Sequence, residues 1–497
     1  MAQQLRLSHV SYSYPDAVTS ALDDVSLTFP QGWTGIVGPN GCGKTTLAML
    51  ASGMLEPTSG SVAPHLSPAY CAQDSGEEPD GLLDFACDYA TDAMELRRLL
   101  RIADDMPWRF QSLSCGEQKK LQIAVALWHR PELLVVDEPT NHVDAECRAQ
   151  LAEALRSFTG IGLLVSHDRE LLDALASQCV WFEGGSVVLR PGDYSAGHEQ
   201  ATLEERTAAR LRSNAKAELD RLAREQRKRR ELASKADARR SGRNLAKHDS
   251  DGRERLRLAV VSGQDGKTGQ LATRMDTRVE RARDQLRRTR VEKRYEGDLW
   301  VGSVPSRHKT LLYMPACEIP CGPEGTLRVP ELFIGNNDRI GVVGPNGSGK
   351  STLVRCIVGL LEDVRGLRVL YMGQELGEGD RARALGMLGS LPASERGRLL
   401  SVVAQLGSDP DRILDGSNAS PGELHKVLIA RGFMRLPELI MLDEPTNHLD
   451  IRSVEALERA LAGFRGALVL VSHDERFLGA TTSVRLEVAD GVVALRR

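Results

Sequence analysis

Short, mostly apolar runs recur in two distant parts of the chain. TGIV ends at Val37 and RIGVV ends at Val343, and each run leads directly into a glycine-rich loop. The runs LLVV and LIML each end in an Asp-Glu pair. Runs of this length that are bounded by glycine or acidic residues are typical of buried parallel strands. Because TLAML and TLVRCIV continue the two loops as helices, both regions are predicted to be α/β.

A helical pattern occupies the middle of the chain. Apolar residues recur at near-helical spacing among Arg, Lys and Glu from residue 197 to about 246, namely Leu203, Leu211, Ala215, Leu219 and Leu222. A second set follows at spacings of 4, 4, 3 and 4 residues, namely Leu271, Met275, Val279, Ala282 and Leu286. The two sets predict an antiparallel hairpin of amphipathic helices. AVVSGQDGKTGQ, residues 259–270, predicts a non-helical crossover, and about 45 helical residues reach roughly 65 Å, too long for a mere tether.

The two α/β regions are copies of one another. Four motifs keep the same offset of 306 residues: the glycine-rich loops from Gly38 and Gly344, Ser114 and Ser420, Asp137 and Asp443, and His167 and His473. A constant offset in four motifs indicates a tandem duplication with an insert. The expected domains are residues 1–196, a basic helical-hairpin linker at 197–300 with its tip near 247–270, and residues 301–497.

Each glycine-rich loop has the sequence and the strand-loop-helix context of a P-loop. Backbone N–H groups of such a loop suit phosphate oxygens. Lys44 and Lys350 are expected to neutralise the β- and γ-phosphates of ATP, and Thr45 and Ser351 to offer a hydroxyl to Mg²⁺. The remaining candidate ATP-binding residues are Gly38, Pro39, Asn40, Gly41, Cys42, Gly43 and Thr46, with Gly344, Pro345, Asn346, Gly347, Ser348, Gly349 and Thr352 in the second copy.

The Asp-Glu pairs are candidates for the metal site and the catalytic base. A buried parallel strand delivers its last residues to the sheet edge where open α/β folds bind ligands. Asp137 and Asp443 are expected to hold Mg²⁺, and Glu138 and Glu444 to polarise the attacking water. The alternative is that the acids only occupy a solvated strand end.

The later motifs carry a family resemblance. LSCGE, ASPGE, DEPTNHVD, DEPTNHLD and the two LVSHD segments resemble the signature, Walker B with D-loop, and switch-histidine motifs of ATP-binding cassette ATPases. The resemblance covers about residues 5–192, the first cassette, and 307–497, the second cassette. Two DEPTNHxD motifs, a charged helical linker and no transmembrane domain together resemble the ABC-F family, whose members act on ribosomes.

The resemblance implies a set of further ATP contacts. The cassettes of one monomer would pair head to tail, so that Lys44 faces residues 420–423 and Lys350 faces residues 114–117, with one ATP between each pair. The implied signature residues are Ser114, Gly116 and Glu117, with Ser420, Gly422 and Glu423. Gln73 and Gln374 would read Mg²⁺ and γ-phosphate, His167 and His473 would contact γ-phosphate, and Asp144 and Asp450 would form the D-loops.

Some positions leave alternatives open. The two glutamines lie at an offset of 301 instead of 306 and could be surface residues, and the two histidines could cap strand ends. Tyr14 fits the aromatic that stacks on adenine in the first cassette, whereas the nearest candidate in the second, Tyr313, has an uncertain register. Cys42 and Cys115 depart from the family pattern, and we interpret both as structural.

The net charge of −4 conceals a basic linker. Residues 201–300 contain 28 Lys and Arg against 17 Asp and Glu, which gives +11. The alternative for such a run is a solvated coiled coil, but the excess of positive charge is larger than neighbouring acids can balance and favours structured RNA as a partner. The chain has no apolar run of about 18 residues and no secretory leader, so we expect a cytoplasmic protein without a membrane span.

Nine scattered cysteines predict reduced thiols, and Cys317 and Cys321 lack a second pair of ligands that would complete a zinc site.

These observations predict an ATPase that binds the ribosome through its linker. In the family, the linker lies beside the P-site tRNA and its tip approaches the peptidyl-transferase centre. The extended tip resembles that of members which give antibiotic resistance by ribosomal protection. The alternatives are a housekeeping ABC-F translation factor, the ATPase component of a drug exporter, and a DNA-maintenance ATPase.

Overall fold

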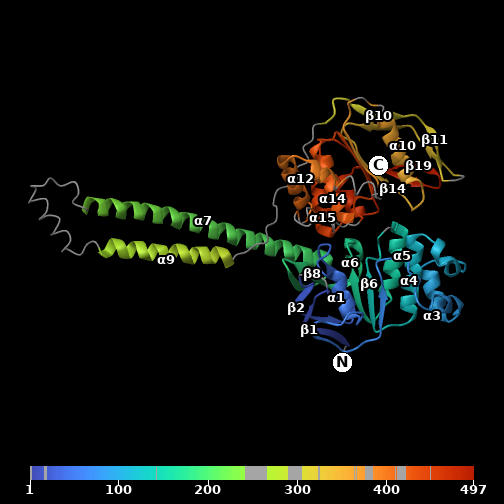
Figure 1. Ribbon diagram of the computed structural model, residues 1–497. Coiled ribbons are helices and arrows are strands. Elements are labelled where there is room, and N and C mark those ends of the chain that lie inside the picture. Colours follow the sequence, from blue (N-terminus) through green and yellow to red (C-terminus); the bar gives the residue numbers. More distant parts are fainter. Residues whose placement is uncertain are drawn as a thin grey trace, which may run out of the picture. The chain divides into compact units, whose positions relative to one another are not determined.

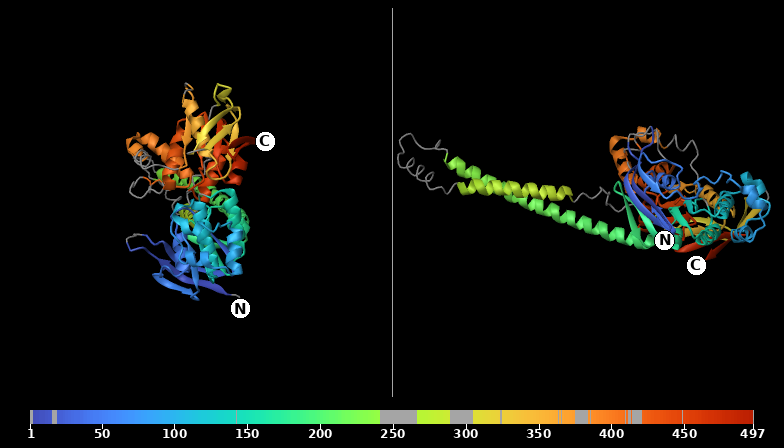
Figure 2. Two further views of the ribbon diagram at one scale, coloured as in Figure 1. Left: turned by 90° about the vertical axis from the view of Figure 1, so that its right-hand side faces the viewer. Right: turned by 90° about the horizontal axis from the view of Figure 1, so that it is seen from below.

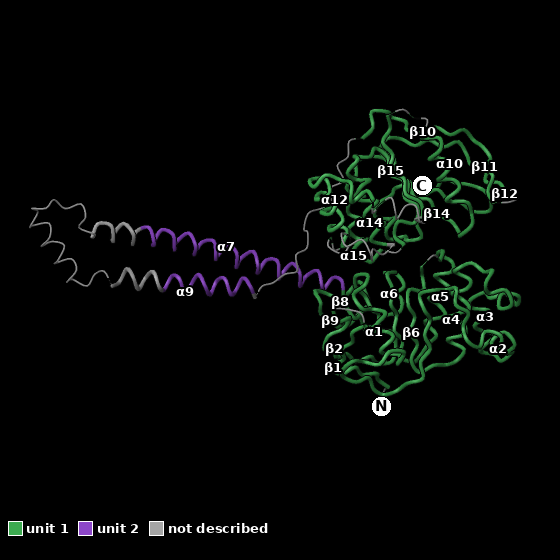
Figure 3. Tube along the Cα trace, in the orientation of Figure 1, with its two compact units in different colours: residues 1–197, 295–497 green, residues 198–294 purple. Residues whose placement is uncertain are grey.

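The structure is a computed structural model that describes two compact units (Figure 3). One unit comprises residues 1–197 and 295–497, which include both cassettes, and the other comprises residues 198–294. The described residues are 3–496 without 16–18, 142, 241–265, 289–304, 323–324, 363, 365, 375–383, 385, 409, 411–412, 414–420 and 448.

The first cassette contains two sheets (Figure 1). Its strands are β1 Gln4–Tyr12, β2 Leu22–Pro30, β3 Gly32–Val37, β4 Ser59–Ala63, β5 Pro68–Cys71, β6 Leu133–Asp137, β7 Ile161–Val165, β8 Ala176–Glu183 and β9 Ser186–Pro191. An antiparallel sheet has the order β2-β1-β4, and a six-stranded sheet has the order β5-β6-β7-β3-β8-β9. All pairs of the larger sheet are parallel except β8 with β9.

The second cassette repeats the parallel core. Its strands are β10 Thr310–Met314, β11 Cys317–Cys321, β12 Gly325–Val329, β13 Leu332–Gly335, β14 Arg339–Val343, β15 Val369–Met372, β16 Leu439–Asp443, β17 Ala467–Val471, β18 Val484–Ala489 and β19 Val492–Arg496. The larger sheet has the order β11-β12-β19-β18-β14-β17-β16-β15, and β10 pairs with β13 separately. The predicted fold of two α/β ATPase cassettes joined by a helical linker is confirmed.

Each cassette also contains helices, some of which begin at aspartate caps that the duplication preserves. In the first cassette they are α1 Lys44–Ala51, α2 Leu82–Cys87, α3 Thr91–Leu99, η1 Met106–Ser112, α4 Cys115–Trp128, α5 Ala145–Arg156 and α6 Arg169–Leu175. In the second they are α10 Lys350–Glu362, α12 Ala393–Gln405, α14 Pro421–Met434, α15 Ile451–Ala462 and α16 Glu475–Thr481. Asp144 and Asp450 accept from backbone N–H groups at 2.9 Å and cap α5 and α15, which satisfies N–H groups that a helix start leaves unpaired.

The order of the buried strands creates the functional edge. Every residue of β6, β7, β16 and β17 is buried, as the continuous apolar runs predict. β7 separates β6 from β3, and β17 separates β16 from β14. Parallel pairing aligns the carboxyl ends of these strands, so each P-loop and each Asp-Glu pair leave the sheet at one edge.

The second unit contains the predicted hairpin. Helix α7 spans Tyr194–Arg240 and α9 spans Gly266–Arg288, and the two run antiparallel and side by side in Figure 1 and in the right-hand view of Figure 2. Leu222 packs with Met275, Val279 and Ala282, with Leu219 at the margin. Asp276 accepts hydrogen bonds from the side chains of Gln226 and Arg230 at 2.5 and 3.0 Å. The apolar spacing therefore identified the seam between the two helices.

One detail of the hairpin prediction is wrong, and two of the leucines that predicted α7 lie outside the seam. Residues 266–270 belong to α9 and not to a non-helical crossover, because the cost of a glycine in a helix, about 1 kcal/mol, is small enough for the following helix to outweigh. Leu203 and Leu211 are 57% and 55% exposed and are not part of the seam. Leu222 packs beside Met275 and Val279, and this pairing places the described end of α9 beside about residue 213 of α7. The described part of helix α9 therefore ends before it reaches Leu203 and Leu211. Residues 241–265, which include most of the predicted tip, lie outside the described residues.

Candidate functional site

Each glycine-rich loop connects a central strand to the helix that begins at its lysine. Gly43 and Gly349, which precede α1 and α10, have φ of 104° and 102°. This left-handed conformation favours glycine and lets the loop turn sharply into the helix. The other predicted loop residues lie in the same two segments or in the first turn that follows: Asn40, Gly41, Cys42, Thr45 and Thr46, and Asn346, Gly347, Ser348, Ser351 and Thr352.

The two lysines fold back over their own loops. The buried ammonium groups of Lys44 and Lys350 each donate two hydrogen bonds to carbonyl oxygens at the start of the loop. The N–O distances lie between 2.8 and 3.0 Å, and the acceptors are Gly38, Pro39, Gly344 and Pro345. Each loop thus encloses a positive charge beside its backbone N–H groups, which is the arrangement that binds phosphate.

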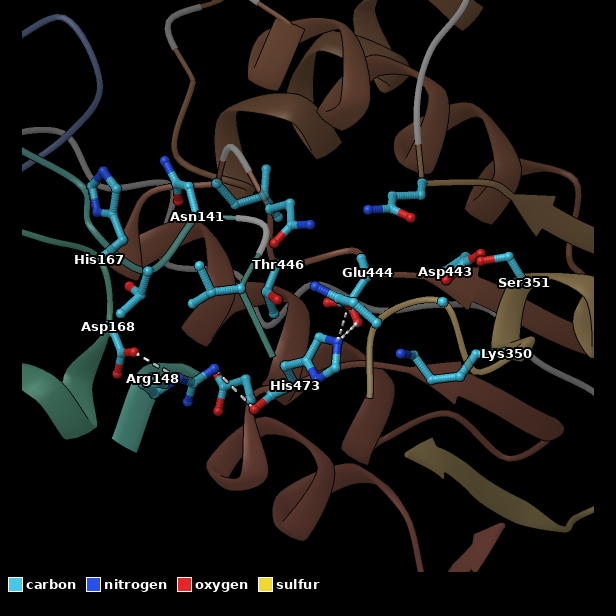
Figure 4. Close-up of a pocket in the computed structure, with 18 of the residues that line it drawn as sticks. Asn141, Arg148, His167, Asp168, Lys350, Ser351, Asp443, Glu444, Thr446 and His473 are labelled. Carbon is cyan, nitrogen blue, oxygen red and sulfur yellow. Dashed lines mark hydrogen bonds and ion pairs between the residues drawn. The ribbon is translucent and has the colours of Figure 1, made fainter. Parts of the chain in front are cut away.

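A hydroxyl from each loop helix contacts the aspartate at the end of the acidic strand. Thr45 Oγ1 donates to Asp137 Oδ2 at 2.8 Å, and the Tyr70 hydroxyl donates to the same oxygen at 3.1 Å. Ser351 is hydrogen-bonded to Asp443 and lies beside it in Figure 4. Oδ1 of each aspartate is buried without a hydrogen-bond partner among the described residues. Burial raises the pKa of both aspartates, and an unpaired carboxylate oxygen next to a hydroxyl fits a hard cation such as Mg²⁺.

The next residue in each copy adopts a strained backbone. Glu138 and Glu444 have φ of 46° and 49°, in a region that costs a non-glycine residue about 1 kcal/mol or more. Their N–H groups donate to Val165 and Val471 at 2.8 and 2.9 Å, so the neighbouring strand fixes this conformation. Both side chains are 5% exposed. The strain turns a second carboxyl group inward next to the first.

A histidine connects each glutamate to the P-loop. His167 Nε2 lies 3.2 Å from Glu138 Oε1 and 3.0 Å from Asn40 Oδ1. The corresponding distances in the second cassette are 3.6 and 3.1 Å, between His473, Glu444 and Asn346. The two copies therefore bring the predicted acid, histidine and loop residues together in the same way.

Burial controls the charge of these groups. It raises the pKa of Glu138 and of Glu444 to about 8, and Lys44 and Lys350 oppose that rise. Burial, assisted by the same lysines, lowers the pKa of His167 to about 3 and that of His473 to about 4. At neutral pH both glutamates are mainly protonated and both histidines are neutral. Added positive charge beside either glutamate favours the carboxylate that can act as a base.

The two predicted glutamines occupy different environments. Gln374 lines the cavity around Lys350. Gln73 is exposed, and its backbone carbonyl accepts a hydrogen bond from the Lys119 ammonium at 3.3 Å. Their roles with Mg²⁺ and γ-phosphate stay predictions.

The first signature segment forms a helix cap. The Ser114 N–H donates to Glu117 Oε2 at 2.9 Å, and the Glu117 N–H is 3.4 Å from Ser114 Oγ, so these residues form a capping box at the start of α4. Gly116 lies in the same turn. Gly422 and Glu423 lie in the first turn of α14, whereas Ser420 is outside the described residues.

The candidate aromatic residues also differ between the cassettes. Tyr14 is 42% exposed, and its hydroxyl lies 3.1 Å from Thr46 Oγ1 beside the first P-loop. Tyr313 is exposed on β10, where its ring contacts that of Phe333 at 4.9 Å between centroids and its hydroxyl donates to Glu331. Tyr313 is absent from the residues that line the cavity around Lys350. The role of Tyr14 as a partner for adenine stays a prediction, and Tyr313 lies away from the cavity around Lys350.

Both cassettes line the cavity around Lys350, which has a volume of about 340 Å³ (Figure 4). Asn141 and Arg148 of the first cassette lie on its wall with Glu444 and His473 of the second. Asp144 of the first cassette does not line the cavity, but its Oδ2 accepts a hydrogen bond at 3.2 Å from the backbone N–H of Asn346, a lining residue in the second P-loop. Among the described residues, the lining does not include residues 114–117, so their pairing with Lys350 stays a prediction for the ATP-bound protein.

Comparison with known proteins identifies the family. The ABC transporter family profile matches residues 22–141 and 327–447. The tylosin resistance ATP-binding protein TlrC of Streptomyces fradiae is 31% identical over 99% of this chain and 98% of its own. This chain belongs to the ABC-F family. Ribosome protection protein VmlR of Bacillus subtilis (strain 168) is 26% identical over 99% of this chain and 87% of its own. The energy-dependent translational throttle protein EttA of Mycobacterium tuberculosis is 28% identical over 93% of this chain and 87% of its own.

The ABC-F chain is an ATPase with two ATP-binding domains. Its fold also resembles that of the archaeal ribosome recycling factor aABCE1, solved in a complex with the ribosomal stalk protein aP1, with a TM-score of 0.60, 20% identity and coverage of 96% of this chain and 87% of the other. Within its described residues, every helix is too short or too polar to cross a bilayer.

Sequence reasoning missed several residues at the ABC-F site. Tyr70 shares Asp137 with Thr45, and a weak signal existed because Tyr70 and Tyr371 keep the same offset of 301 as the two glutamines. Arg169 of the first cassette forms an ion pair with Glu458 of the second at 3.0 Å, and no repeat in the sequence predicts this pair.

Burial raises the pKa of the Cys42 thiol, which agrees with a structural role for this cysteine. In the described part of the chain, no three His, Cys, Asp or Glu side chains group together as they would in a zinc site, at Cys317 and Cys321 or elsewhere.

The raised pKa of the two glutamates predicts a loss of stability in mild alkali. A folded-state pKa of about 8 against the ordinary 4.5 means that the folded protein binds more protons than the unfolded protein between these values, so its free energy of unfolding falls as pH rises. The histidines, with lowered pKa, contribute the opposite slope only below their ordinary 6.5. From pH 6.5 to 8, wild type should lose up to about 2 kcal/mol per glutamate. Denaturant unfolding of the E138Q/E444Q variant should show a flatter dependence, and equal slopes would contradict the assignment.

Proposed function

We propose that this ABC-F ATPase hydrolyses two ATP molecules in sites shared between its cassettes and uses the cycle to bind and leave the ribosome. The observation that carries the proposal is the matched constellation of P-loop lysine, aspartate, glutamate and histidine at both carboxyl edges, on a chain that also contains a basic helical hairpin. Lys44 and Lys350 contact the β- and γ-phosphates, and Glu138 and Glu444 orient and activate the attacking water.

Mg²⁺ completes each site in this proposal. Thr45 and Asp137 hold the ion in the first cassette, and Ser351 and Asp443 hold it in the second, with Gln73 and Gln374 as further ligands. The unpaired Oδ1 atoms and the adjacent hydroxyls support this assignment. The bound ion supplies charge neutralisation for the phosphate oxygens. His167 and His473, neutral and fixed between the loop asparagine and the glutamate, contact the γ-phosphate.

ATP joins the cassettes in the active state. Ser114, Gly116 and Glu117 cover the nucleotide on Lys350, and Ser420, Gly422 and Glu423 cover the nucleotide on Lys44, within one monomer. The contact between Asp144 and the second P-loop supports a site that both cassettes build. Hydrolysis then separates the cassettes, which gives the switch two states.

The hairpin supplies the RNA-binding surface. Arg227, Lys228, Arg274, Arg281 and Arg283 are exposed on α7 and α9 and have no ion pair or hydrogen bond within the described residues. Unpaired cations of this density bind phosphate backbones, with an affinity that falls as salt rises. We infer that the hairpin lies against ribosomal RNA and the P-site tRNA, with residues 259–270 near the peptidyl-transferase centre.

Antibiotic resistance by ribosomal protection is the favoured role. Two relatives that match nearly the whole chain are named for tylosin resistance and for ribosome protection. A tip near the drug site can shift nucleotides or tRNA and so displace a drug without touching it. A housekeeping translation factor is the second candidate, because EttA is also similar over most of its length.

The E138Q/E444Q variant should remain on ribosomes after it binds ATP, because the cassettes close but the water is not activated. Sedimentation through a sucrose cushion should recover it with 70S particles, whereas wild type should dissociate. The same variant with K44A and K350A is the matched control and should not be retained, because it loses the phosphate-binding lysines. Release at the wild-type rate would contradict the cycle, and recovery with membranes instead of ribosomes would favour the exporter.

Expression of the chain in a sensitive bacterium should raise the inhibitory concentration of tylosin or of another drug that binds the peptidyl-transferase centre. Deletion of residues 259–270 should remove the protection and leave ribosome binding in place. Protection that survives the deletion would refute the role of the tip. Ribosome binding without protection from any such drug would favour the housekeeping factor.

A further inference from the structure

Arg148 of α5 reaches from the first cassette to the histidine of the second. Its Nη2 donates a hydrogen bond to the carbonyl oxygen of His473 at 3.0 Å. Figure 4 shows the guanidinium between Asp168 and His473. The side chain is 15% exposed and lines the cavity around Lys350. A largely buried cation therefore forms part of a nucleotide site whose P-loop belongs to the other cassette.

The first cassette holds this guanidinium in place. Nε lies 3.1 Å from Asp168 Oδ2, and Nη1 lies 3.4 Å from Glu170 Oε2. These two acids provide counter-charge on the near side, which reduces the cost of removing arginine from water. The planar guanidinium then directs its remaining donor, Nη2, towards the carbonyl oxygen of His473. The flexible ammonium of a lysine does not supply this geometry.

The accepting carbonyl belongs to a short segment that positions the His473 ring. The segment leaves β17 and enters α16, where Asp474 caps the helix through the Phe477 N–H at 2.8 Å. On the other side of the residue, His473 Nε2 lies 3.1 Å from Asn346 Oδ1 and 3.6 Å from Glu444 Oε1. A fixed carbonyl restricts how the backbone can turn, and so it restricts where the ring lies between the P-loop and the glutamate.

The duplication does not preserve this residue. The position 306 residues after Arg148 is Val454, a buried residue whose apolar side chain packs in the core of the second cassette. Valine has no side-chain donor for the backbone of His167. By contrast, the glutamates, the histidines and the P-loop lysines are identical in the two copies. The two sites therefore differ in what the opposite cassette supplies.

We propose that Arg148 is a positioning residue that the first cassette supplies to the site of Lys350, and that the site of Lys44 hydrolyses ATP without such a residue. This inference rests on the proposed function, because it takes Glu444 and His473 as parts of the hydrolytic site. Hydrolysis at Lys350 thus depends on contact between the cassettes through Arg148, and the two ATP sites work unequally.

Single-site variants test the proposal in the full-length protein. E138Q leaves the site of Lys350 active, and E444Q leaves the site of Lys44 active. Adding R148A to E138Q should lower kcat for ATP about tenfold, as loss of a charge-assisted hydrogen bond predicts, with KM unchanged because Arg148 does not contact the P-loop phosphate cradle. Adding R148A to E444Q should change both constants much less, although it removes the partner of Asp168 beside His167.

Two further variants separate positioning from docking. R148K keeps a positive donor and should restore part of kcat in the E138Q background. R452A removes another ion pair between the cassettes, from Arg452 to Glu183 at 3.5 Å, and should leave both single-site rates unchanged. If R148A does not give folded protein, R148M replaces it. Methionine keeps the packing of the aliphatic part of the arginine side chain and removes the hydrogen-bond donor, so the expected rates are the same.

Equal effects of R148A in the two backgrounds, or none in either, would overturn the proposal. It would also fail if E138Q alone abolished hydrolysis, because the site of Lys350 would then not act independently. Failure of the proposed function gives a different result: hydrolysis that persists at the wild-type rate in E138Q/E444Q would show that the glutamates are not the bases.

Discussion

Each nucleotide site depends on two carboxyl groups that are kept out of water beside a P-loop lysine. β6 and β16 are buried along their whole length and end in Asp137 and Asp443, and the strained glutamate that follows turns inward as well. Burying two acids together is unfavourable unless one is neutral or cations approach them. In this chain the P-loop lysine supplies one positive charge, and in the proposed cycle a bound Mg²⁺ ion supplies further positive charge. The same burial that raises the pKa of the glutamates makes the site responsive to its ligand.

Polar and charged contacts join the cassettes at these sites. Asp144 binds the second P-loop, Arg148 binds the backbone of His473, and Arg169 pairs with Glu458. Charged contacts of this kind form and break more readily than an apolar core, which suits the joining and parting of the cassettes in the proposed cycle. The basic hairpin gives that motion an RNA partner in our proposal, because its exposed arginines exceed the acids available to pair with them. Val454 in place of a second arginine makes the coupling one-sided.

The sequence predicted the parts of the molecule that repeat. Strands such as LLVVD and the P-loops are local patterns, and their constant offset placed Lys44 with Asp137 before any contact was known. Tyr70 was missed because its hydrogen bond to Asp137 depends on the pairing of β5 with β6, and the offset of 301 that it shares with Tyr371 does not reveal that pairing. Arg148 was missed because its partner belongs to the other cassette. Leu203 and Leu211 lie on α7 as their spacing predicts but are exposed, since periodicity predicts a face of a helix but not what covers it.

The titration of the two buried glutamates tests the account most directly. Carbon-13 labelling of glutamate carboxyl groups, with E138Q and E444Q to assign the signals, allows NMR to follow each group with pH in the protein without nucleotide. Burial of both groups predicts two carboxyl signals that titrate with a pKa of about 8, one of which is lost in each variant. Titration of both near the ordinary 4.5 would contradict it, because neither acid would then be buried beside its P-loop.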